Sequence, residues 1–311
     1  MSHDFITYWR DRISFLDVHY HVSPDTFIRR HNVITAGEIY KNLGGAVVLK
    51  NHLGDSVSMA ETARLCGLPV MGSVVLNQVA GGPTWRSVEE SLCKRQAEHS
   101  GRMIIHLPTV TAVQNKNKVD RTLANDYCAK ARSQGVSISD ENGALHKDVI
   151  EILHLARDNP VVISSGHTSR AETLTLIEMA ERIGVPRLML NQPANPMTGL
   201  SAQDLVNLSG ADWLFIEQTA LTYLLGWQTW EDYSRVLSEV PNVVYSSDLG
   251  QTSQIDLPEW YDQSLKWFEE MNLSETRRNA IWLDNPLKML SSLAKIAAVL
   301  MPNNGGNTYR E

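Results

Sequence analysis

Cysteine is scarce in this chain of 311 residues: there are three, Cys66, Cys93 and Cys128, and they stand far apart. An odd, widely spaced set fits neither a disulfide framework nor a zinc knuckle. We therefore interpret the cysteines as reduced thiols in the core or on helices. This interpretation favours a reducing compartment, and we expect the protein to be cytoplasmic.

Long apolar runs and an excess of basic charge are missing as well. No run of about 18 apolar residues occurs, and the N-terminal segment MSHDFITYWRDR lacks the apolar core of a signal peptide. Lys and Arg number 28 against 35 Asp and Glu, which gives a net charge of -7. Phosphate backbones and anionic membranes require a basic surface, so we expect neither nucleic acid nor a membrane as a partner.

What is present is the composition of an ordinary globular protein, with 43% hydrophobic and 20% charged residues. The eight tryptophans, Trp227 among them, are interpreted as packing residues. Eight short runs rich in β-branched residues end in polar residues, and segments with helical spacing separate most of them. The runs cover 13–19, 46–52, 69–77, 102–108, 161–167, 187–193, 212–218 and 243–249. The helical segments include 58–68, 87–101, 146–159 and 169–184.

This alternation predicts an α/β fold. Continuous apolar strands separated by amphipathic helices are typical of a parallel sheet, and eight such units close a (β/α)₈ or TIM barrel. We predict a single barrel domain over 1–300 and a loose tail over 301–311. Residues 135–139 predict a short β-hairpin inserted after the fourth unit, or alternatively a ninth strand that would weaken the barrel count.

Metal-ligating residues collect at the ends of these runs, where the chemistry of a barrel gathers. His19 and His21 end the first run, and side chains at i and i+2 of a strand point to the same side. His167 ends the fifth run and Asp248 the eighth. A lone His-x-His pair more often lies on the protein surface and binds no metal. Together, however, the four residues predict a site for Zn²⁺, with Mn²⁺ or Fe²⁺ as alternatives, that leaves a position for water.

Other run ends predict the surroundings of a substrate. Lys50 and His52 end the second run, and His106 ends the fourth. A lysine in a barrel mouth needs a partner such as a carboxylate, a substrate oxyanion or a metal-bridging carbamate, although a salt bridge at the rim is the alternative. His52 and His106 could each equally be a residue of the cavity wall that supports a metal ligand. Gln192 and Glu217 end the sixth and seventh runs and are predicted to bind substrate, with a structural acceptor as the alternative for Glu217.

With these positions in view, the sequence resembles the amidohydrolase superfamily of metal-dependent barrels. In that superfamily a His-x-His pair ends the first strand, histidines end the fifth and usually the sixth, and an aspartate ends the eighth. His19, His21, His167 and Asp248 fill three of these four strand positions. The strings DVHYHVSPD, VVLKNHLGD, HLPTV, SSGHTS, SSDLGQ and DNPLKML resemble an amidohydrolase-related branch of unknown function, over about residues 16 to 290.

Two departures from that pattern bear on the number of metals. The sixth position, where the pattern has His-Pro, reads Gln192-Pro193, so a weaker amide replaces the usual ligand. No lysine ends the fourth run, where binuclear members carry a carbamylated bridging residue, and the only lysine at a run end is Lys50. We therefore expect one tight metal, with a second site near Lys50, His52 and His106 as an alternative.

The resemblance implies a hydrolase that cleaves an amide, cyclic amide or lactone in a small molecule. Asp248 is the expected acid and base: it accepts a proton from the water that the metal activates and then protonates the leaving group. Lys50, His52 or His106 stabilises the developing oxyanion or holds a substrate carboxylate. Alternatives are a metal-dependent non-oxidative decarboxylase, a phosphoesterase, and a barrel that binds metal or ligand without catalysis. The class also leads us to expect a homo-oligomer.

Overall fold

Two parallel sheets run through the part of the chain that the computed structural model describes, residues 5–96, 98–111, 121–132 and 135–291. The first sheet has the order β1-β2-β3 and the second the order β4-β5-β6-β7-β8-β9, with every neighbouring pair parallel. The prediction of an α/β fold is therefore confirmed, and the expected tail 301–311 lies outside the described residues. The strands are β1 Phe15–His21, β2 Gly45–Lys50, β3 Val70–Met71, β4 Ser73–Val75, β5 Met103–His106, β6 Val161–Ser164, β7 Leu188–Leu190, β8 Leu214–Thr219 and β9 Val243–Ser246.

Each of the eight predicted runs overlaps a strand, but the third run is divided in two. Gly72 separates β3 from β4, and a Cβ atom at this position would lie 2.5 Å from Cα of Val57. Helix α3 (Val57–Leu65) therefore begins too close to the strand for any side chain there. The backbone N–H of Ser56 donates to the carbonyl of Ser73 at 2.9 Å, so the start of the helix interrupts the strand pairing at this point.

Hydrogen bonds connect the first strand of one sheet with the chain that leaves the last strand of the other. The backbone N–H of Asp248 donates to the carbonyl of His19, and that of His21 donates to the carbonyl of Leu249, both at 2.9 Å. Tyr20 and Leu249 form a parallel bridge between these bonds. Segments from opposite ends of the chain thus lie side by side at the carboxyl ends of β1 and β9.

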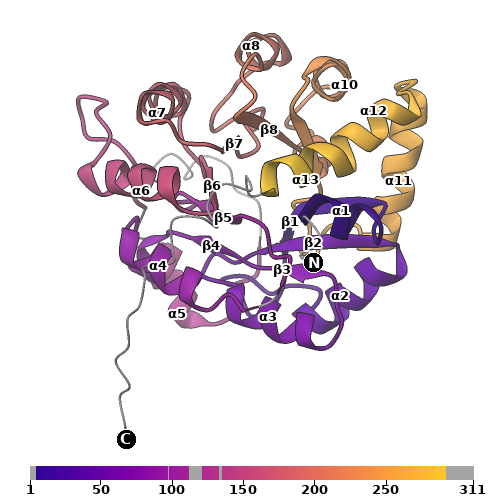
Figure 1. Cartoon of the computed structure of the whole chain (residues 1–311), viewed down its shortest axis with the longest axis horizontal. Coiled ribbons are helices and arrows are strands. Elements are labelled where there is room, and N and C mark those ends of the chain that lie inside the picture. The colour runs from indigo at the N-terminus through magenta and orange to yellow at the C-terminus, as the bar shows by residue number, and fades with distance from the viewer. Residues whose placement is uncertain (1–4, 97, 112–120, 133–134, 292–311) are drawn as a thin grey trace, which may run out of the picture.

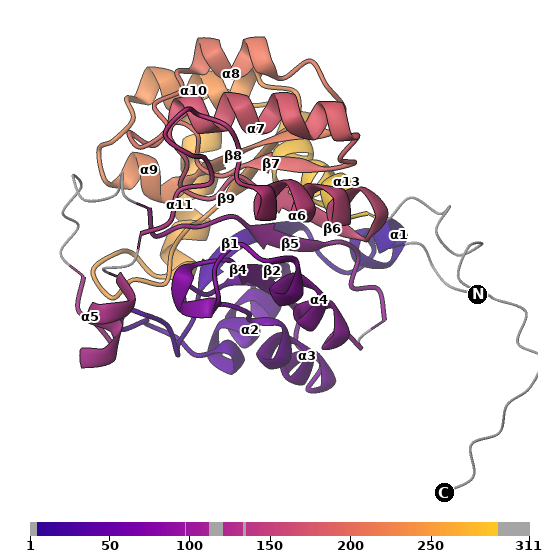
Figure 2. The same ribbon diagram turned by 90° about the vertical axis from the view of Figure 1, so that its left-hand side faces the viewer.

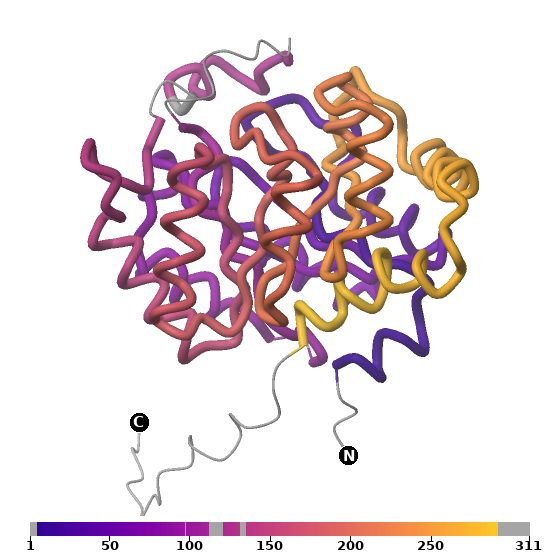
Figure 3. Tube along the Cα trace, turned by 90° about the horizontal axis from the view of Figure 1, so that it is seen from above, coloured from indigo at the N-terminus to yellow at the C-terminus, as the bar shows by residue number. Residues whose placement is uncertain are grey.

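Helices lie outside the strands, as the views in Figures 1, 2 and 3 show together. Helix α7 shows how local sequence sets their position: Ser169 and Glu172 form a capping box at its start, and Gly184 ends it with a φ of 82°. The helices that follow successive strands are α2 Val33–Asn42, α3, α4 Trp85–Cys93, α6 Lys147–Asp158, α7 Arg170–Ile183, α8 Ala202–Leu208, α10 Trp230–Glu239 and α11 Leu257–Glu270. The additional helices are α1 Phe5–Arg10, η1 Gln78–Ala80, α5 Asp126–Arg132, α9 Ala220–Leu224, α12 Glu275–Asn279, the π-helical turn η3 Ala280–Asp284 and α13 Asn285–Leu290.

One predicted helix is shorter than its sequence pattern. The spacing predicts a helix over 87–101, but α4 ends at Cys93. Beyond it, Nζ of Lys94 lies 2.6 Å from Oδ2 of Asp55, and the guanidinium of Arg95 donates to the carbonyl of Gly101 at 2.5 Å. These tertiary contacts turn the chain back toward the next strand and override the helical pattern.

A group of buried apolar side chains lies on the inner side of the strands. It takes at least one side chain from each strand except β4, and α1 and α13 pack against the same group. Each strand is also covered on its outer side by the helices, as expected for a sheet buried on both faces. The strand members of the inner group are Leu16, Val18, Ala46, Val48, Met71, Ile104, Val162, Met189, Phe215 and Val244.

The segment after α5 forms a turn rather than a further strand. The backbone N–H of Asp140 donates to the carbonyl of Ala144 at 2.9 Å, and Ser139 and Leu145 form one antiparallel bridge. The predicted hairpin is therefore present in its shortest form, and the alternative of a ninth strand in this segment is wrong. The three cysteines form no disulfide, as predicted. Within the described ranges, none of the helices combines the length and the apolar character needed to cross a bilayer.

Candidate metal centre and cavity

Three predicted ligands meet at the carboxyl ends of β1 and β9. Nε2 of His19 lies 3.3 Å from Nε2 of His21 and 2.9 Å from Oδ1 of Asp248. Nε2 of His21 lies 3.2 Å from the same oxygen. All three side chains are buried. Neighbouring ligand atoms around a tetrahedral zinc with bonds of about 2.0–2.1 Å stand about 3.3 Å apart, so the spacing of these donors fits such an ion.

A bulge in β1 helps to aim both imidazoles inward. The pairing of β1 with β2 shifts register between Asp17 and Tyr20. Phe15 and Tyr20 pack in the same outer cluster, although an unbroken strand would point residues five apart to opposite faces. The bulge therefore restores the outward direction of Tyr20, and His19 and His21 on either side of it point inward.

Carboxylates on other parts of the chain lie near Nδ1 of each imidazole, and one of them orients His19. Nδ1 of His19 lies 2.9 Å from Oε1 of Glu217, and Nδ1 of His21 lies 3.6 Å from Oδ2 of Asp25. A carboxylate oxygen accepts, so Nδ1 of His19 carries a hydrogen, whereas Nδ1 of His21 makes no hydrogen bond within the described residues. Metal-ligating histidines commonly donate their other ring nitrogen to a carboxylate, as His19 does. The Nε2 atoms of both rings and the carboxylate of Asp248 converge, and a cation would stabilise this arrangement.

The pKa values of His19, His21 and Asp248 reflect burial and the attraction between the imidazoles and the carboxylate. Burial lowers the pKa of His21 to about 3, so its ring is neutral. Burial alone would raise the pKa of Asp248, but the adjacent His19 and His21 hold it well below its usual value. At His19 burial favours the neutral ring, but the charges of Asp248 and Glu217 and the hydrogen bond to Asp248 together outweigh it and raise the pKa. The anion of Asp248 thus favours positive charge beside it, and a divalent cation would compete with a proton for this place.

Glu217 lies behind His19 and is not among the residues that line the cavity. It is 1% exposed, and its carboxylate accepts hydrogen bonds from Oγ of Ser246 at 2.8 Å and from the backbone N–H of Gln192 at 3.1 Å. The side-chain amide of Asn191 donates to it as well. These contacts favour the structural alternative for Glu217, because they fill the carboxylate and orient His19, and its role in substrate binding stays a prediction.

Unusual backbone conformations gather at the same place. Asp248 and Gln192 have φ values of 53° and 42°, and non-glycine residues with positive φ cluster at functional sites because the strain must be offset by their surroundings. Position 250 has room only for glycine, because a Cβ atom there would lie 2.0 Å from the carbonyl oxygen of His21. The loop that carries Asp248 is therefore pressed against the end of β1.

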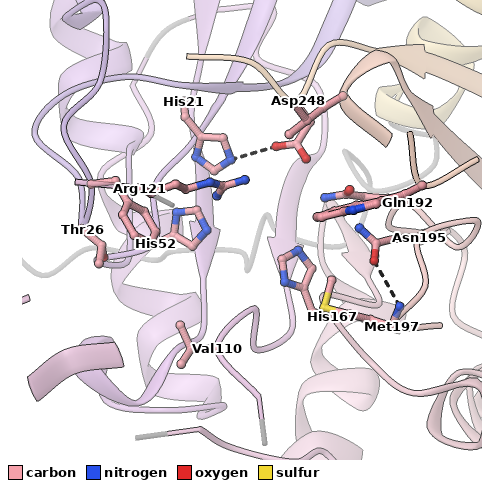
Figure 4. Close-up of a pocket in the computed structure, with 13 residues that line it drawn as sticks. His21, Thr26, His52, Val110, Arg121, His167, Gln192, Asn195, Met197 and Asp248 are labelled. Atoms are coloured by element: carbon pink, nitrogen blue, oxygen red, sulfur yellow. Dashed lines mark hydrogen bonds and ion pairs between the residues drawn. The ribbon is translucent and has the colours of Figure 1, made fainter. Parts of the chain in front are cut away.

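A cavity opens beside this centre, with an empty volume of about 800 Å³ that includes its mouth. Figure 4 shows His21, His52, His167, Gln192 and Asp248 around it. Its lining combines polar and apolar side chains: His21, Thr26, Phe27, His52, Val110, Arg121, His167, Gln192, Asn195, Met197, Leu221, Trp227 and Asp248.

His167 faces this cavity but stands apart from the other three predicted ligands. The ligand atoms of His19, His21 and Asp248 lie within 4.8 Å of one another, and His167 is not part of that group. Gly166 holds the turn before it, because a Cβ atom there would lie 2.2 Å from the carbonyl oxygen of Leu107. The structure therefore brings together three of the four predicted ligands and places the fourth on the wall of the same cavity.

Lys50 and His106 are fully buried and are not among the cavity-lining residues. Nζ of Lys50 donates to Oδ1 of Asn191 at 2.9 Å, so its partner is an amide rather than a carboxylate or a salt bridge at the rim. Burial lowers its pKa to about 8, against the opposing charges of Glu217 and Asp248. Nδ1 of His106 lies 2.9 Å from Oγ of Ser164, and its buried Nε2 has no hydrogen-bond partner within the described part of the chain.

Asp25 belongs to a buried cluster with Arg29 and His52. Its carboxylate accepts from Nε of Arg29 at 2.7 Å and from Nδ1 of His52 at 3.1 Å. The ring of His52 stacks on that of His21 with centroids 4.6 Å apart. Asp25 therefore orients His52 and lies 3.6 Å from Nδ1 of His21, and its place four residues after His21 in DVHYHVSPD is the signal that could have identified it.

Two further lining residues are absent from the sequence-based set. Trp227, interpreted as a packing residue, lines the cavity, which corrects that interpretation. Arg121 also lines it and lies just beyond residues that the structure does not describe. No spacing rule links Arg121 to a strand end, so sequence alone offered no signal for it.

The fold and these contacts define an α/β protein in which buried His and Asp groups at the carboxyl ends of parallel strands could hold a metal ion. Residues 14–217 match the model of a family described as a family of unknown function, DUF6282, and the chain belongs to that family. The matched part includes His19, His21 and His167 and ends before Asp248. No curated protein matches the chain.

Proposed function

We propose that this protein is a metal-dependent hydrolase of a small molecule, related to the amidohydrolase superfamily. One observation carries the proposal: Nε2 of His19, Nε2 of His21 and Oδ1 of Asp248 converge within 2.9–3.3 Å of one another, with a carboxylate behind each imidazole. The hydrogen bond from Nδ1 of His19 to Glu217 adds support, because metal-ligating histidines commonly donate their other ring nitrogen to a carboxylate.

The same proposal includes closure of the two sheets into a (β/α)₈ barrel. Two observations support closure. The backbone bonds from Asp248 to His19 and from His21 to Leu249 join the chain after β9 to β1. Side chains from all eight strand runs also meet in one inner apolar group, as in the filled interior of a barrel. In a closed barrel the metal centre lies at the face where active sites of this fold are found.

His19, His21 and Asp248 would hold the ion, with His167 as a further donor from the cavity wall. Nitrogen and carboxylate donors suit Zn²⁺ best, and Mn²⁺ or Fe²⁺ are alternatives. One tight site is favoured. A second group of ligand atoms comprises His21, Asp25 and His52, but Asp25 is already engaged by Arg29, which reduces what it can offer a second ion.

The residues divide the chemistry between them. A divalent cation in this centre supplies a Lewis acid that activates water and polarises a carbonyl group. Asp248 reaches the cavity lining and can hold a proton there as acid and base. Lys50, fixed by Asn191 and buried, contributes positive charge near His19 and His167, while the stacked ring of His52 lines the cavity.

The test is metal content together with turnover. We expect purified protein supplied with Zn²⁺, Mn²⁺ or Fe²⁺ to retain about one equivalent of one of them by mass spectrometry. His19→Asn and His21→Asn should lose it, whereas His154→Asn, on the exposed face of α6, should keep it. A screen of amides, cyclic amides and lactones should then give hydrolysis by the loaded protein.

Two outcomes would count against this function. Protein that retains none of the three metals would remove its basis. Release of carbon dioxide from small carboxylic acids, without hydrolysis of any ester or amide, would instead support the decarboxylase alternative.

A further inference from the structure

Two side-chain amides on the loop after β7 line the cavity. Gln192 and Asn195 are 5% and 2% exposed, and Figure 4 shows their side chains on the same side of the cavity. Neither residue carries a charge, so these two side chains can recognise a ligand only through hydrogen bonds. The amide atoms that have no partner in the protein therefore indicate which groups a ligand must offer.

Asn195 presents a hydrogen-bond donor to the cavity. Its Oδ1 accepts from the backbone N–H of Met197 at 3.1 Å. This bond distinguishes the oxygen from the nitrogen, because a backbone N–H needs an acceptor. Nδ2 is therefore the atom that turns toward the cavity, as Figure 4 shows, and it makes no hydrogen bond to any residue in the described ranges.

Gln192 keeps both a donor and an acceptor for a ligand. Within the described part of the chain, its Nε2 and Oε1 make no hydrogen bond. The backbone is nevertheless held firmly: the φ angle is 42°, and the N–H donates to Oε2 of Glu217, whose Oε1 accepts from His19. A strained residue that is fixed beside the metal centre, and whose side chain supports no other part of the fold, is a candidate for contact with a ligand.

Hydrogen bonds set the spacing of the two amides before any ligand binds. The backbone N–H of Asn195 donates to the carbonyl of Gln192 at 2.9 Å. Oγ1 of Thr198 donates to the carbonyl of Thr168 at 2.7 Å, which ties this loop to the segment that follows β6. Such preorganisation lowers the entropic cost of binding.

The unpaired atoms call for a ligand with both an N–H and a carbonyl group. A carboxylate or a lactone has only acceptors, so it would leave Oε1 of Gln192 buried without a partner, which is unfavourable. An amide satisfies all three atoms: its N–H donates to Oε1, and the two lone pairs of its carbonyl oxygen accept from Nε2 of Gln192 and Nδ2 of Asn195.

The two groups of the ligand must also lie on the same edge to pair with one glutamine side chain. An open-chain secondary amide is trans and places its N–H and its carbonyl on opposite sides. A ring that contains the amide imposes the cis form, in which both groups share an edge. The geometry of the amide pair therefore favours a cyclic amide over an open-chain amide.

We propose that the cavity takes a cyclic amide or imide, whose N–H and carbonyl pair with the side-chain amides of Gln192 and Asn195. The proposal rests on the proposed function, because it names the substrate class of the same cavity. The apolar side chains of Phe27, Leu221 and Trp227 supply a wall for the rest of the ring.

The test is calorimetric binding of three neutral probes of equal size: isoindolinone, a cyclic amide; phthalide, the matching lactone; and N-methylbenzamide, an open-chain amide. Isoindolinone should bind zinc-loaded protein about tenfold more tightly than the other two, because neither of them can complete the pair with Gln192. Gln192→Met should abolish this preference. Gln203→Met, an exposed change on α8, is the matched control and should bind as the parent does.

Asn195→Asp tests the second amide. Its Oδ1 can still accept from Met197, but the donor is lost, so isoindolinone and phthalide should weaken to a similar extent and the preference between them should stay. Unchanged affinity for both probes in Asn195→Asp would remove Asn195 from the proposed pair. Thermal unfolding of each variant shows that a lost preference does not reflect a lost fold.

The titration is repeated on metal-free protein, which separates this proposal from the metal function. A preference for isoindolinone that depends on Gln192, in protein unable to retain metal, would support the amide site and refute the metal function. Zinc-loaded protein that binds the three probes equally would overturn the amide site and leave the metal function standing. A Gln192→Met variant that still prefers isoindolinone, or that no longer retains zinc, would also overturn the amide site, the latter because Gln192 would then be a metal ligand.

Discussion

Nδ1 of His19 donates to Oε1 of Glu217 across 2.9 Å, so a side chain of β8 decides which nitrogen of a β1 side chain faces the centre. Both groups are buried, and Oε1 of Glu217 also accepts from Ser246. The tautomer of His19 is thus set by residues about two hundred positions away in the chain.

Glu217→Gln should therefore weaken metal binding without removing a ligand. A glutamine amide would place a donor where Glu217 now accepts from the backbone of Gln192, so the side chain must turn and release His19. Loss of such an orienting carboxylate costs about 10–100-fold in metal affinity. Chelator competition measures this, with Glu178→Gln on the exposed face of α7 as the control. Unchanged affinity in Glu217→Gln would show that His19 is oriented by other contacts.

Asp248→Asn should separate metal binding from catalysis. The amide oxygen can still approach the ion, but the side chain can no longer accept a proton, so kcat on the substrate found by screening should fall by about 100-fold or more. Metal content should stay close to that of the parent. Asp262→Asn, an exposed change on α11, should leave both quantities unchanged. Undiminished turnover in Asp248→Asn would refute its role as acid and base.

Gly250→Ala should disrupt the centre from the backbone side. The new Cβ would stand 2.0 Å from the carbonyl oxygen of His21, so the loop that carries Asp248 must move. Gly67→Ala is a matched control, because Gly67 also has a positive φ of 75° but nothing within 4 Å of an added Cβ. Both changes should cost about 1–2 kcal/mol of backbone strain by urea unfolding, and only Gly250→Ala should lose metal as well. Full metal binding by Gly250→Ala would contradict the close contact.

Glu172 should make the free energy of unfolding depend on pH in the acid range. Burial would raise its pKa, but hydrogen bonds from Ser137, Ser169 and the backbone of Ile138 outweigh burial and lower it. A lowered folded-state pKa stabilises the protein above the ordinary value of 4.5, and the contribution disappears as the pH falls through the lowered pKa.

The matching measurement is urea unfolding of the parent and Glu172→Gln at several pH values. At neutral pH the variant should be less stable by about 1 kcal/mol, because the half-buried carboxylate is partly screened by solvent. The difference should shrink toward zero as the pH falls below 4.5. Glu181→Gln, exposed on the same helix, should show no such trend. A difference that stays constant with pH would mean that the charge of Glu172 does not stabilise the fold.

The local sequence pattern predicted the secondary structure correctly where interactions between neighbouring residues determine it. Apolar β-branched runs became strands, because burial on both faces rewards such residues at every position. Ser169 and Gly184 delimit α7 where capping chemistry predicts. The 87–101 segment failed as a helix because Lys94 and Arg95 found tertiary partners, which spacing along the chain does not reveal.

The chain by itself determined the ligand types and the strand ends that carry them: His19 and His21 share one face of β1, and Asp248 follows β9. Only the tertiary structure decided that Glu217 orients His19, that Asp25 orients His52, that His167 stands on the cavity wall, and that Arg121 reaches the cavity. The reason is physical. Periodicity specifies the side of an element to which a residue points, whereas the partner it meets depends on how distant segments pack, which no local interaction encodes.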